Sequence, residues 1–396
     1  MRHANRLAVL AAALALVAAA CGSSSKSSSS GGNTTVPTGQ QTLGASEGSV
    51  SILAWPGYAE NGSNDPKVNW VKPFEAASGC KATVKYFGTS DEAFNLFKTG
   101  QYDVVSSSGD ATLRMVADGD AAVINTGLLT NWNDLDPLLK TKPWNSVNGV
   151  VYGVPHGWGA NLLMYNKNVV KPAPDSWGTV FDASSPYKGK ITGYDSPIYI
   201  ADGALYLMKT QPNLGIKDPY ALDDTQFNAV VKLMKVQRPL IGEYWSDYLK
   251  EQDAFTKGSL VLGTTWQITT NGVQADKTSP PVDAIIPKEG STAWSDSWMI
   301  DAKAKHPNCA YMWINWITKP DIQAQVAQYF GEAPANLKAC PLTAKGFCEQ
   351  YHAGDPAFYG KLAYWKTPTA KCLDGRTGVT CKDYAAWTAA WDEIKG

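Results

Sequence analysis

Apolar runs of strand length alternate with amphipathic stretches along most of the chain. Residues 49–55 form a mostly apolar run that ends in Trp-Pro-Gly, which is typical of a buried strand followed by a turn. Residues 68–77 repeat apolar positions at helical spacing, and Gly79 follows them as a helix stop. Residues 103–107 again have the pattern of a buried strand. This alternation of strand and helix predicts an α/β fold with a mostly parallel sheet.

The same patterns continue to the end of the chain. Further strands are predicted at residues 82–87, 151–154, 162–166, 191–194, 260–265, 282–286 and 298–300. Further helices are predicted at residues 92–99, 112–117, 201–208, 226–236, 309–317, 322–330 and 384–395. Because ligands of parallel sheets bind outside the carboxyl ends of the strands, residues 55–58 and 106–110 are expected near a ligand.

The first residues have the pattern of an export signal. A positively charged start precedes an apolar run at residues 7–20, which is too short to span a bilayer, and Ala-Ala-Ala-Cys follows at residues 18–21. This end resembles the bacterial lipobox, which implies cleavage before Cys21 and its lipidation, although Ala18 stands where Leu is commoner. The alternative is a plain signal peptide with an incidental cysteine. Residues 1–20 are therefore predicted to be a lipoprotein signal peptide.

Composition separates a tether from a folded part. Residues 21–48 are mostly Ser, Gly, Thr and Gln, so they are expected to form a disordered tether on the lipidated cysteine. About 350 residues follow, enough for two domains of ordinary size. The net charge of −1 provides no basic field for nucleic acid, and no later segment is apolar and long enough to cross a membrane. The 15 Trp and 18 Tyr residues suggest an aromatic ligand wall beside the core.

The cysteines that remain after Cys21 are even in number, which in an exported chain indicates disulfides. Several connectivities are possible. Cys340 with Cys348 and Cys372 with Cys381 each bracket a short loop with turn residues, so local pairing is the simplest hypothesis, and it leaves Cys80 with Cys309. A zinc site is the alternative, but no Cys-x-x-Cys pair supports it, and no metal or other cofactor is predicted.

An ordered set of short motifs resembles one known family, the spermidine/putrescine-binding periplasmic proteins, within the type II solute-binding proteins of ABC importers. The resemblance covers about residues 49–335. The motifs are Trp55-Pro-Gly-Tyr58, Gly100-Gln-Tyr-Asp-Val-Val105, Leu135-Asp136-Pro137, Tyr152-Gly-Val-Pro155, Trp158-Gly159, Tyr187-Lys-Gly189, Gly258-Ser-Leu-Val-Leu262, Trp266, Pro287-Lys-Glu-Gly290, Trp294-Ser-Asp-Ser297 and Lys319-Pro-Asp321.

The resemblance implies a type II periplasmic-binding-protein fold, in which two α/β lobes are joined by crossing hinge strands and close on a ligand. Lobe one would comprise residues 49–157 and 295–337, and lobe two residues 158–294 and 338–396. The protein would be an extracytoplasmic lipoprotein, anchored to the membrane only through Cys21. Its partners would be the permease subunits of an ABC importer, and it would be a monomer.

The ligand residues implied by the resemblance follow from position in the motifs. Aromatic rings sandwich the ligand in this family, and carboxylates hold its ammonium groups. A tryptophan face attracts a cation by roughly 0.5–2 kcal/mol, and a desolvated carboxylate adds charge-assisted hydrogen bonds. The candidate ligand-binding residues are Trp55, Tyr58, Ser107, Ser108, Asp195, Ser196, Tyr199, Trp266, Trp294, Asp296, Glu332 and Lys366.

Several of these positions depart from the family pattern. Ser196 and Tyr199 stand at lobe-two positions where acids bind amines, and Asp195 lies beside the position of the binding acid. Glu332 replaces the usual Tyr, and Lys366 stands where a neutral amide is expected. The loss of a binding acid in lobe two and the presence of Lys366 disfavour a long polycation as the ligand. They suit a ligand with one ammonium and an anionic or neutral end, such as 4-aminobutyrate held by Asp296 and Lys366.

Other functions remain as alternatives. A type II binding protein can bind a non-amine solute such as a sugar or ferric iron, although no adjacent tyrosine pair supports iron binding. A secreted hydrolase is a further alternative, but the chain contains no Gly-x-Ser-x-Gly, P-loop, His-Glu-x-x-His or Gly-x-Gly-x-x-Gly motif. The sequence therefore predicts a binding protein for a small amine, and not an enzyme.

Overall fold

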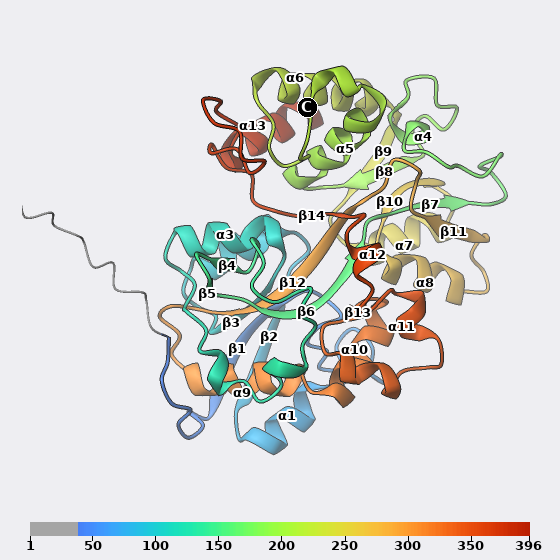
Figure 1. Ribbon diagram of the computed structural model, residues 1–396. Helices are drawn as coiled ribbons and strands as arrows, with labels where there is room; N and C mark the ends of the chain where they lie inside the picture. The colour runs from blue at the N-terminus through green and yellow to red at the C-terminus, as the bar shows by residue number, and fades with distance from the viewer. Residues whose placement is uncertain (1–38) are drawn as a thin grey trace, which may run out of the picture. The chain divides into compact units, whose positions relative to one another are not determined.

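Two mixed sheets organise residues 39–396, the part of the chain that the computed structural model describes (Figure 1). The predicted signal peptide and Cys21 lie outside these residues. The first sheet has the order β13-β6-β12-β3-β1-β2, with β14 beside β12, and the second has the order β11-β7-β10-β8-β9. A short hairpin, β4 (Ser146–Val147) and β5 (Val150–Val151), stands apart from them.

Most strands of the two sheets lie where the sequence predicts a strand, but β6 and β12 extend beyond the predicted residues 151–154 and 298–300. The strands of the first sheet are β1 (Ser49–Ala54), β2 (Lys81–Tyr86), β3 (Val104–Ser107), β6 (Val154–Ala160), β12 (Thr292–Ile300), β13 (Ala333–Pro334) and β14 (Ala363–Tyr364). The strands of the second sheet are β7 (Leu162–Asn166), β8 (Ile191–Tyr194), β9 (Ile241–Trp245), β10 (Leu262–Thr265) and β11 (Val282–Ile285). The sequence patterns did not indicate β9.

The main helices cover these sheets. They are α1 (Val71–Ser78), α2 (Ser90–Phe97), α3 (Gly109–Ala117), α4 (Gly178–Phe181), α5 (Ile200–Thr210), α6 (Asp224–Gln237), α7 (Tyr248–Thr256), α8 (Gln267–Ala275), α9 (Pro307–Ile317), α10 (Pro320–Phe330), α11 (Phe347–Gln350), α12 (Pro356–Tyr359) and α13 (Tyr384–Lys395). Figure 1 shows α1 and α9 below β1–β3 and α3 above them. Within the described residues, no helix combines the length and apolar character needed to cross a membrane.

The prediction of a mostly parallel sheet was wrong for the strands that cross between the two sheets. β1 pairs in parallel with β2 and β3, and β8 pairs in parallel with β9 and β10, because helices connect these strands. In contrast, β12 is antiparallel to β3 and β6, and β7 is antiparallel to β10 and β11. Both sheets are therefore mixed.

Two connections carry the chain between the sheets. β6 leads through Asn161 into β7, and β11 leads back into β12, which runs beside β6 (Figure 1). A chain of buried hydrogen bonds joins the two crossings. The Trp266 indole donates to Asn161 Oδ1 (3.1 Å), Asn161 Nδ2 donates to Thr292 Oγ1 (2.7 Å), and Thr292 Oγ1 donates to Asp202 Oδ1 (2.8 Å). These bonds fix the relative position of the two crossing segments.

The C-terminal part of the chain contacts both sheets' helices. The 3-10 helix η6 (Leu337–Leu342) packs on α10, whereas α13 packs on α6 of the second sheet. The lobe boundaries given above, including the assignment of residues 338–396 to lobe two, stay a prediction.

The folded part begins before residue 49. Gly44 N and the Gln40 amide both bond to Asn308 Oδ1, and Glu47 accepts hydrogen bonds from the backbone of Asn308 and Cys309 at the start of α9. The last part of the predicted tether is thus held against α9.

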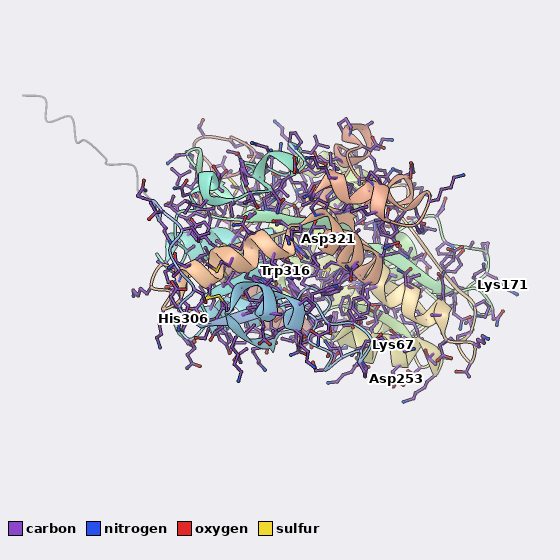
Figure 2. All side chains as sticks on the ribbon, turned by 90° about the horizontal axis from the view of Figure 1, so that it is seen from below. Lys67, Lys171, Asp253, His306, Trp316 and Asp321 are labelled. Atoms are coloured by element: carbon purple, nitrogen blue, oxygen red, sulfur yellow. A yellow bond between two sulfur atoms is a disulfide. The ribbon has the colours of Figure 1, made fainter. Side chains whose placement is uncertain are left out.

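The predicted cysteine pairing is confirmed: the structure contains Cys80–Cys309, Cys340–Cys348 and Cys372–Cys381. Cys80–Cys309 joins the end of the α1 segment to α9, and Figure 2 shows these two helices side by side near a yellow sulfur–sulfur bond. The other two bridges each close a short surface loop.

Removing the bridge between distant segments should destabilise the protein more than removing a local one. The sequence separation is 229 for Cys80–Cys309 and 8 for Cys340–Cys348. The chain-entropy relation gives about 5 kcal/mol for the first loop and about 2.5 kcal/mol for the second. We therefore expect the Cys80→Ser/Cys309→Ser variant to unfold at lower denaturant concentration than Cys340→Ser/Cys348→Ser. Equal midpoints would contradict this ranking.

Buried acids should make stability rise as the pH is lowered from 8 to 6. Burial raises the pKa of Asp202 to about 7, and burial together with Asp91 raises the pKa of Asp110 to about 7. The folded state then binds more protons than the unfolded state in this window, so protonation relieves a destabilisation that is present at pH 8. The lowered pKa of His156 opposes this only below its ordinary value of 6.5.

The measurement is the thermal midpoint at pH 8 and pH 6, for the parent chain and for Asp202→Asn. Asparagine keeps an acceptor for Thr292 and carries no charge, so the variant should be more stable than the parent at pH 8 and should show a smaller pH dependence. A parent chain that loses stability from pH 8 to pH 6 would refute the prediction.

Candidate functional site

Residues from both sheets meet at one small cavity beside the crossing strands. Trp55 follows β1, Trp266 follows β10, and Trp294 and Asp296 lie on β12. The lining residues are Trp55, Ser108, Trp266, Trp294, Asp296, Phe330 and Trp365. The cavity measures about 10 Å³, which is the room of one water molecule. A larger ligand requires these rings to move apart.

Strand geometry explains the placement of Trp294 and Asp296. Alternate residues of a strand point to the same face, so both side chains of the Trp-Ser-Asp motif face the cavity. β6 makes room for its neighbours through two glycines. A β-carbon on Gly157 would lie 2.4 Å from Glu332 Oε2, and one on Gly159 would lie 2.5 Å from the Trp294 ring. Side chains at these positions would displace Glu332 and Trp294.

Aromatic rings form most of the wall. The Trp55 and Trp266 rings meet edge to face, with centroids 5.6 Å apart, and Trp294 meets Phe330 in the same way at 5.5 Å. Trp365 stacks on Tyr194 with an interplanar angle of 11°. The indole N–H groups of Trp55, Trp294 and Trp365 are buried and have no hydrogen-bond partner among the described residues. The wall thus combines aromatic rings with three buried indole N–H groups that have no partner among residues 39–396.

Among the described residues that line the cavity, Asp296 is the only carboxylate, and it is 3% exposed. Ser108 Oγ donates to Asp296 Oδ1 (2.5 Å), and Tyr58 Oη lies 2.8 Å from Asp296 Oδ2. Behind it, Tyr58 Oη also lies 3.0 Å from Glu332 Oε2. Burial raises the pKa values of Asp296 and of Glu332 above their ordinary values. The arrangement can hold a cation that reaches Asp296.

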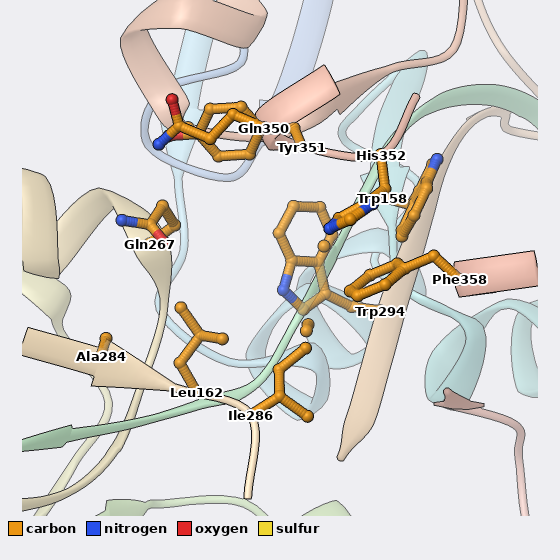
Figure 3. A pocket seen from close by; sticks show the side chains of 13 residues that line it. Trp158, Leu162, Gln267, Ala284, Ile286, Trp294, Gln350, Tyr351, His352 and Phe358 are labelled. Carbon is orange, nitrogen blue, oxygen red and sulfur yellow. The ribbon is translucent and has the colours of Figure 1, made fainter. Parts of the chain in front are cut away.

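A larger cavity of about 280 Å³ adjoins the first one, and Trp294 lines both. Figure 3 shows the Trp294 ring between Leu162 and Ile286 on one side and Tyr351 and His352 on the other. This second cavity is mainly apolar and aromatic, and the residues from the described part of the chain that line it include no carboxylate. It provides space for an uncharged part of a ligand.

The structure brings together predicted residues of both lobes at one position. Five of the candidates line the small cavity, and Tyr58 and Glu332 are linked to Asp296 behind its wall. Ser107 lies next to them but is buried in β3, and its hydroxyl contacts only the Ser108 carbonyl, at 3.4 Å.

The predicted polar residues of lobe two do not reach this cavity. Asp195 binds Lys395 and the Trp391 indole, and Tyr199 is buried, where it accepts a hydrogen bond from Gln237. Ser196 is buried. Lys366 binds Asp218 at 2.5 Å and lines a different cavity. The lysine therefore stands away from Asp296, although its neighbour Trp365 lines the site.

Sequence reasoning missed Phe330 and Trp365 as lining residues and His156 as a neighbour of the site. Phe330 ends α10 with the spacing of an ordinary core residue, and the tail around Trp365 matches no family motif, so neither carried a distinguishing signal. His156 is fully buried, and its ring lies 4.1 Å from the Tyr58 ring. No group of three or more His, Cys, Asp or Glu in residues 39–396 could hold a metal ion.

Comparison with known proteins gives a family match over most of the chain. The family model described as bacterial extracellular solute-binding protein matches residues 69–347. Among curated proteins, the spermidine/putrescine-binding periplasmic protein of Escherichia coli (strain K12) is 29% identical over 273 residues, which is 68% of this chain and 74% of the relative.

Solved structures share the fold. The spermidine/putrescine ABC transporter substrate-binding protein PotD from Streptococcus pneumoniae has a TM-score of 0.65 at 19% identity and covers 87% of this chain and 97% of its own. The Atu4243-GABA receptor has a TM-score of 0.58 at 17% identity and covers 88% of this chain and 95% of its own.

Proposed function

The chain belongs to the bacterial extracellular solute-binding proteins, and we propose that it captures a small amine-containing solute between its two lobes and delivers it to an ABC importer. The observation that carries the proposal is Asp296, a carboxylate buried among tryptophan rings that has no lysine or arginine partner among residues 39–396. Burying a carboxylate is costly unless a cation or donors compensate. An ammonium group of a solute supplies the missing cation.

The aromatic wall supports an amine in the same way. Trp55, Trp266 and Trp294 surround the position next to Asp296, and an indole face attracts a cation by roughly 0.5–2 kcal/mol. The names of the E. coli relative and the S. pneumoniae structure refer to spermidine and putrescine, and that of the Atu4243 structure to GABA. All three are amines, so the shared chemistry agrees with the local geometry.

The lipid anchor is part of the proposal. Export and lipidation of Cys21 would hold the protein on the outer face of the cell membrane, near the permease subunits that receive the solute. The support is the Ala-Ala-Ala-Cys sequence after a short apolar run. The residues lie outside the described part of the chain.

The test of amine binding is a thermal-shift and calorimetric screen of the disulfide-bonded protein with polyamines, ω-amino acids, quaternary amines and sugars. A ligand at 100 times its dissociation constant should stabilise the protein by about 2.7 kcal/mol. Stabilisation by amines, with none by sugars, is expected. A sugar that binds while every amine fails would overturn the amine proposal and leave the family assignment intact.

Asp296→Asn should weaken the best amine ligand about 30-fold or more, because a desolvated charge pair loses one partner. The asparagine keeps an acceptor oxygen for one of the hydroxyls of Ser108 and Tyr58, and its amide N–H can donate to the other, so the fold should persist. Asp195→Asn is the matched control, since Asp195 binds Lys395 away from the cavity, and its affinity should equal that of the parent. Affinity should also fall as the pH is lowered, because protonation removes the charge of Asp296. Equal affinities for Asp296→Asn and Asp195→Asn would count against this site.

A further inference from the structure

A single hydroxyl links two buried carboxyl groups beside the cavity. Tyr58 Oη lies 2.8 Å from Asp296 Oδ2 and 3.0 Å from Glu332 Oε2, and all three residues are at most 3% exposed. A tyrosine hydroxyl has one proton, which forms one near-linear hydrogen bond. The second short contact is a full hydrogen bond if that carboxyl group is protonated and donates to Tyr58.

No neighbouring cation can replace that proton. Among residues 39–396, the only basic side chain within 4.0 Å of either carboxyl group is His156, whose Nε2 lies 3.5 Å from Glu332 Oε1. The Trp298 indole, which can only donate, bonds to His156 Nδ1 at 3.0 Å. Nδ1 therefore carries no proton, and His156 is the neutral tautomer with its proton on Nε2. From α10, the group that faces His156 is the uncharged amide of Gln323.

The hydrogen bonds also decide which acid keeps the proton. Asp296 is within reach of two hydroxyl donors, Ser108 and Tyr58, which stabilise its ionised form. Glu332 has only the shared hydroxyl and the long contact to His156. Burial raises the pKa of Glu332 well above its ordinary value, which agrees with this order. The chain then runs from Glu332–OH to Tyr58–OH to the Asp296 carboxylate.

Unlike the Asp296 carboxylate, which attracts a cation, the indole N–H groups require a hydrogen-bond acceptor. Trp55, Trp294 and Trp365 line the same cavity, and each has a buried N–H without a partner. An acceptor on the ligand can satisfy such a donor, whereas an ammonium group cannot. The described residues that line the larger cavity beside Trp294 include no carboxylate, so a ligand that extends past Trp294 meets none there. Glu92 and Asp247 line a third cavity, beside Trp55 and Trp266.

We propose that Glu332 is a neutral carboxylic acid that donates a hydrogen bond to Tyr58, so that the site carries one negative charge. A site with this charge selects a solute with one ammonium group and a hydrogen-bond-accepting other end in preference to a diamine. Glu332 acts through Tyr58 and is a positioning residue. The selectivity rests on the proposed amine-binding function, whereas the protonation of Glu332 can be measured without any ligand.

The protonation is tested by infrared difference spectroscopy at pH 7. The parent chain should show the carbonyl band of a protonated carboxylic acid that is absent from Glu332→Gln, whose amide keeps a donor for Tyr58. Glu251→Gln is the control, because burial also raises the pKa of Glu251, at a separate position, and it should leave the Glu332 band in place. Tyr58→Phe should shift the band by removing its acceptor. Identical spectra of parent and Glu332→Gln in this region would overturn the proposal.

The selectivity is tested with three probes of equal chain length: putrescine, 4-aminobutan-1-ol and 4-aminobutyrate. We expect the two monoamines to bind at least tenfold more tightly than putrescine at pH 7, and Glu332→Gln to keep this ratio within about twofold. Tighter binding of putrescine would overturn the selectivity. If no amine binds at all, the proposed function fails, while the infrared result still decides the protonation of Glu332.

Discussion

The desolvation of one carboxylate on the crossing strand β12 constrains the whole site. Asp296 is removed from water, and the hydroxyls of Ser108 and Tyr58 compensate only in part for the lost solvation. Those two residues come from the ends of different segments of the first sheet, so the carboxylate ties them to β12. The same incomplete compensation makes the position attractive to an ammonium group.

The two lobes depend on this region for their connection. β6 and β12 pair along their length, and the hydrogen bonds from Trp266 through Asn161 and Thr292 to Asp202 link the crossings to the second sheet. Trp266 belongs both to this chain and to the cavity wall. A ligand that moves the Trp266 ring therefore acts directly on the contacts that join the two sheets.

Two glycines of β6 and the side chains that pack against them keep the cavity small. Glycine at positions 157 and 159 leaves room for the Glu332 carboxyl group and the Trp294 ring, and Glu332 in turn reaches the hydroxyl of Tyr58. These residues are distant in sequence but touch through side chains. Changes of charge or size at any one of them should alter the others, since packed neighbours do not vary independently.

The sequence by itself determined the alternation of strands and helices, the hydrophobic core runs and the family motifs, because each of these depends on residues close together in the chain. It also indicated Trp55, Trp266, Trp294 and Asp296, since each follows or occupies a strand in a recognisable motif. It did not predict the full length of β12, because Trp-Ser-Asp-Ser alternates large and polar residues and has no apolar run, although all of the strand is buried. Only the tertiary structure decided that Lys366 binds Asp218, that Asp195 binds Lys395 and that Phe330 and Trp365 complete the cavity. A long side chain can pair with any suitable partner that the fold brings near. Which partner it contacts depends on distances between segments that are remote in sequence, and local sequence patterns do not contain these distances.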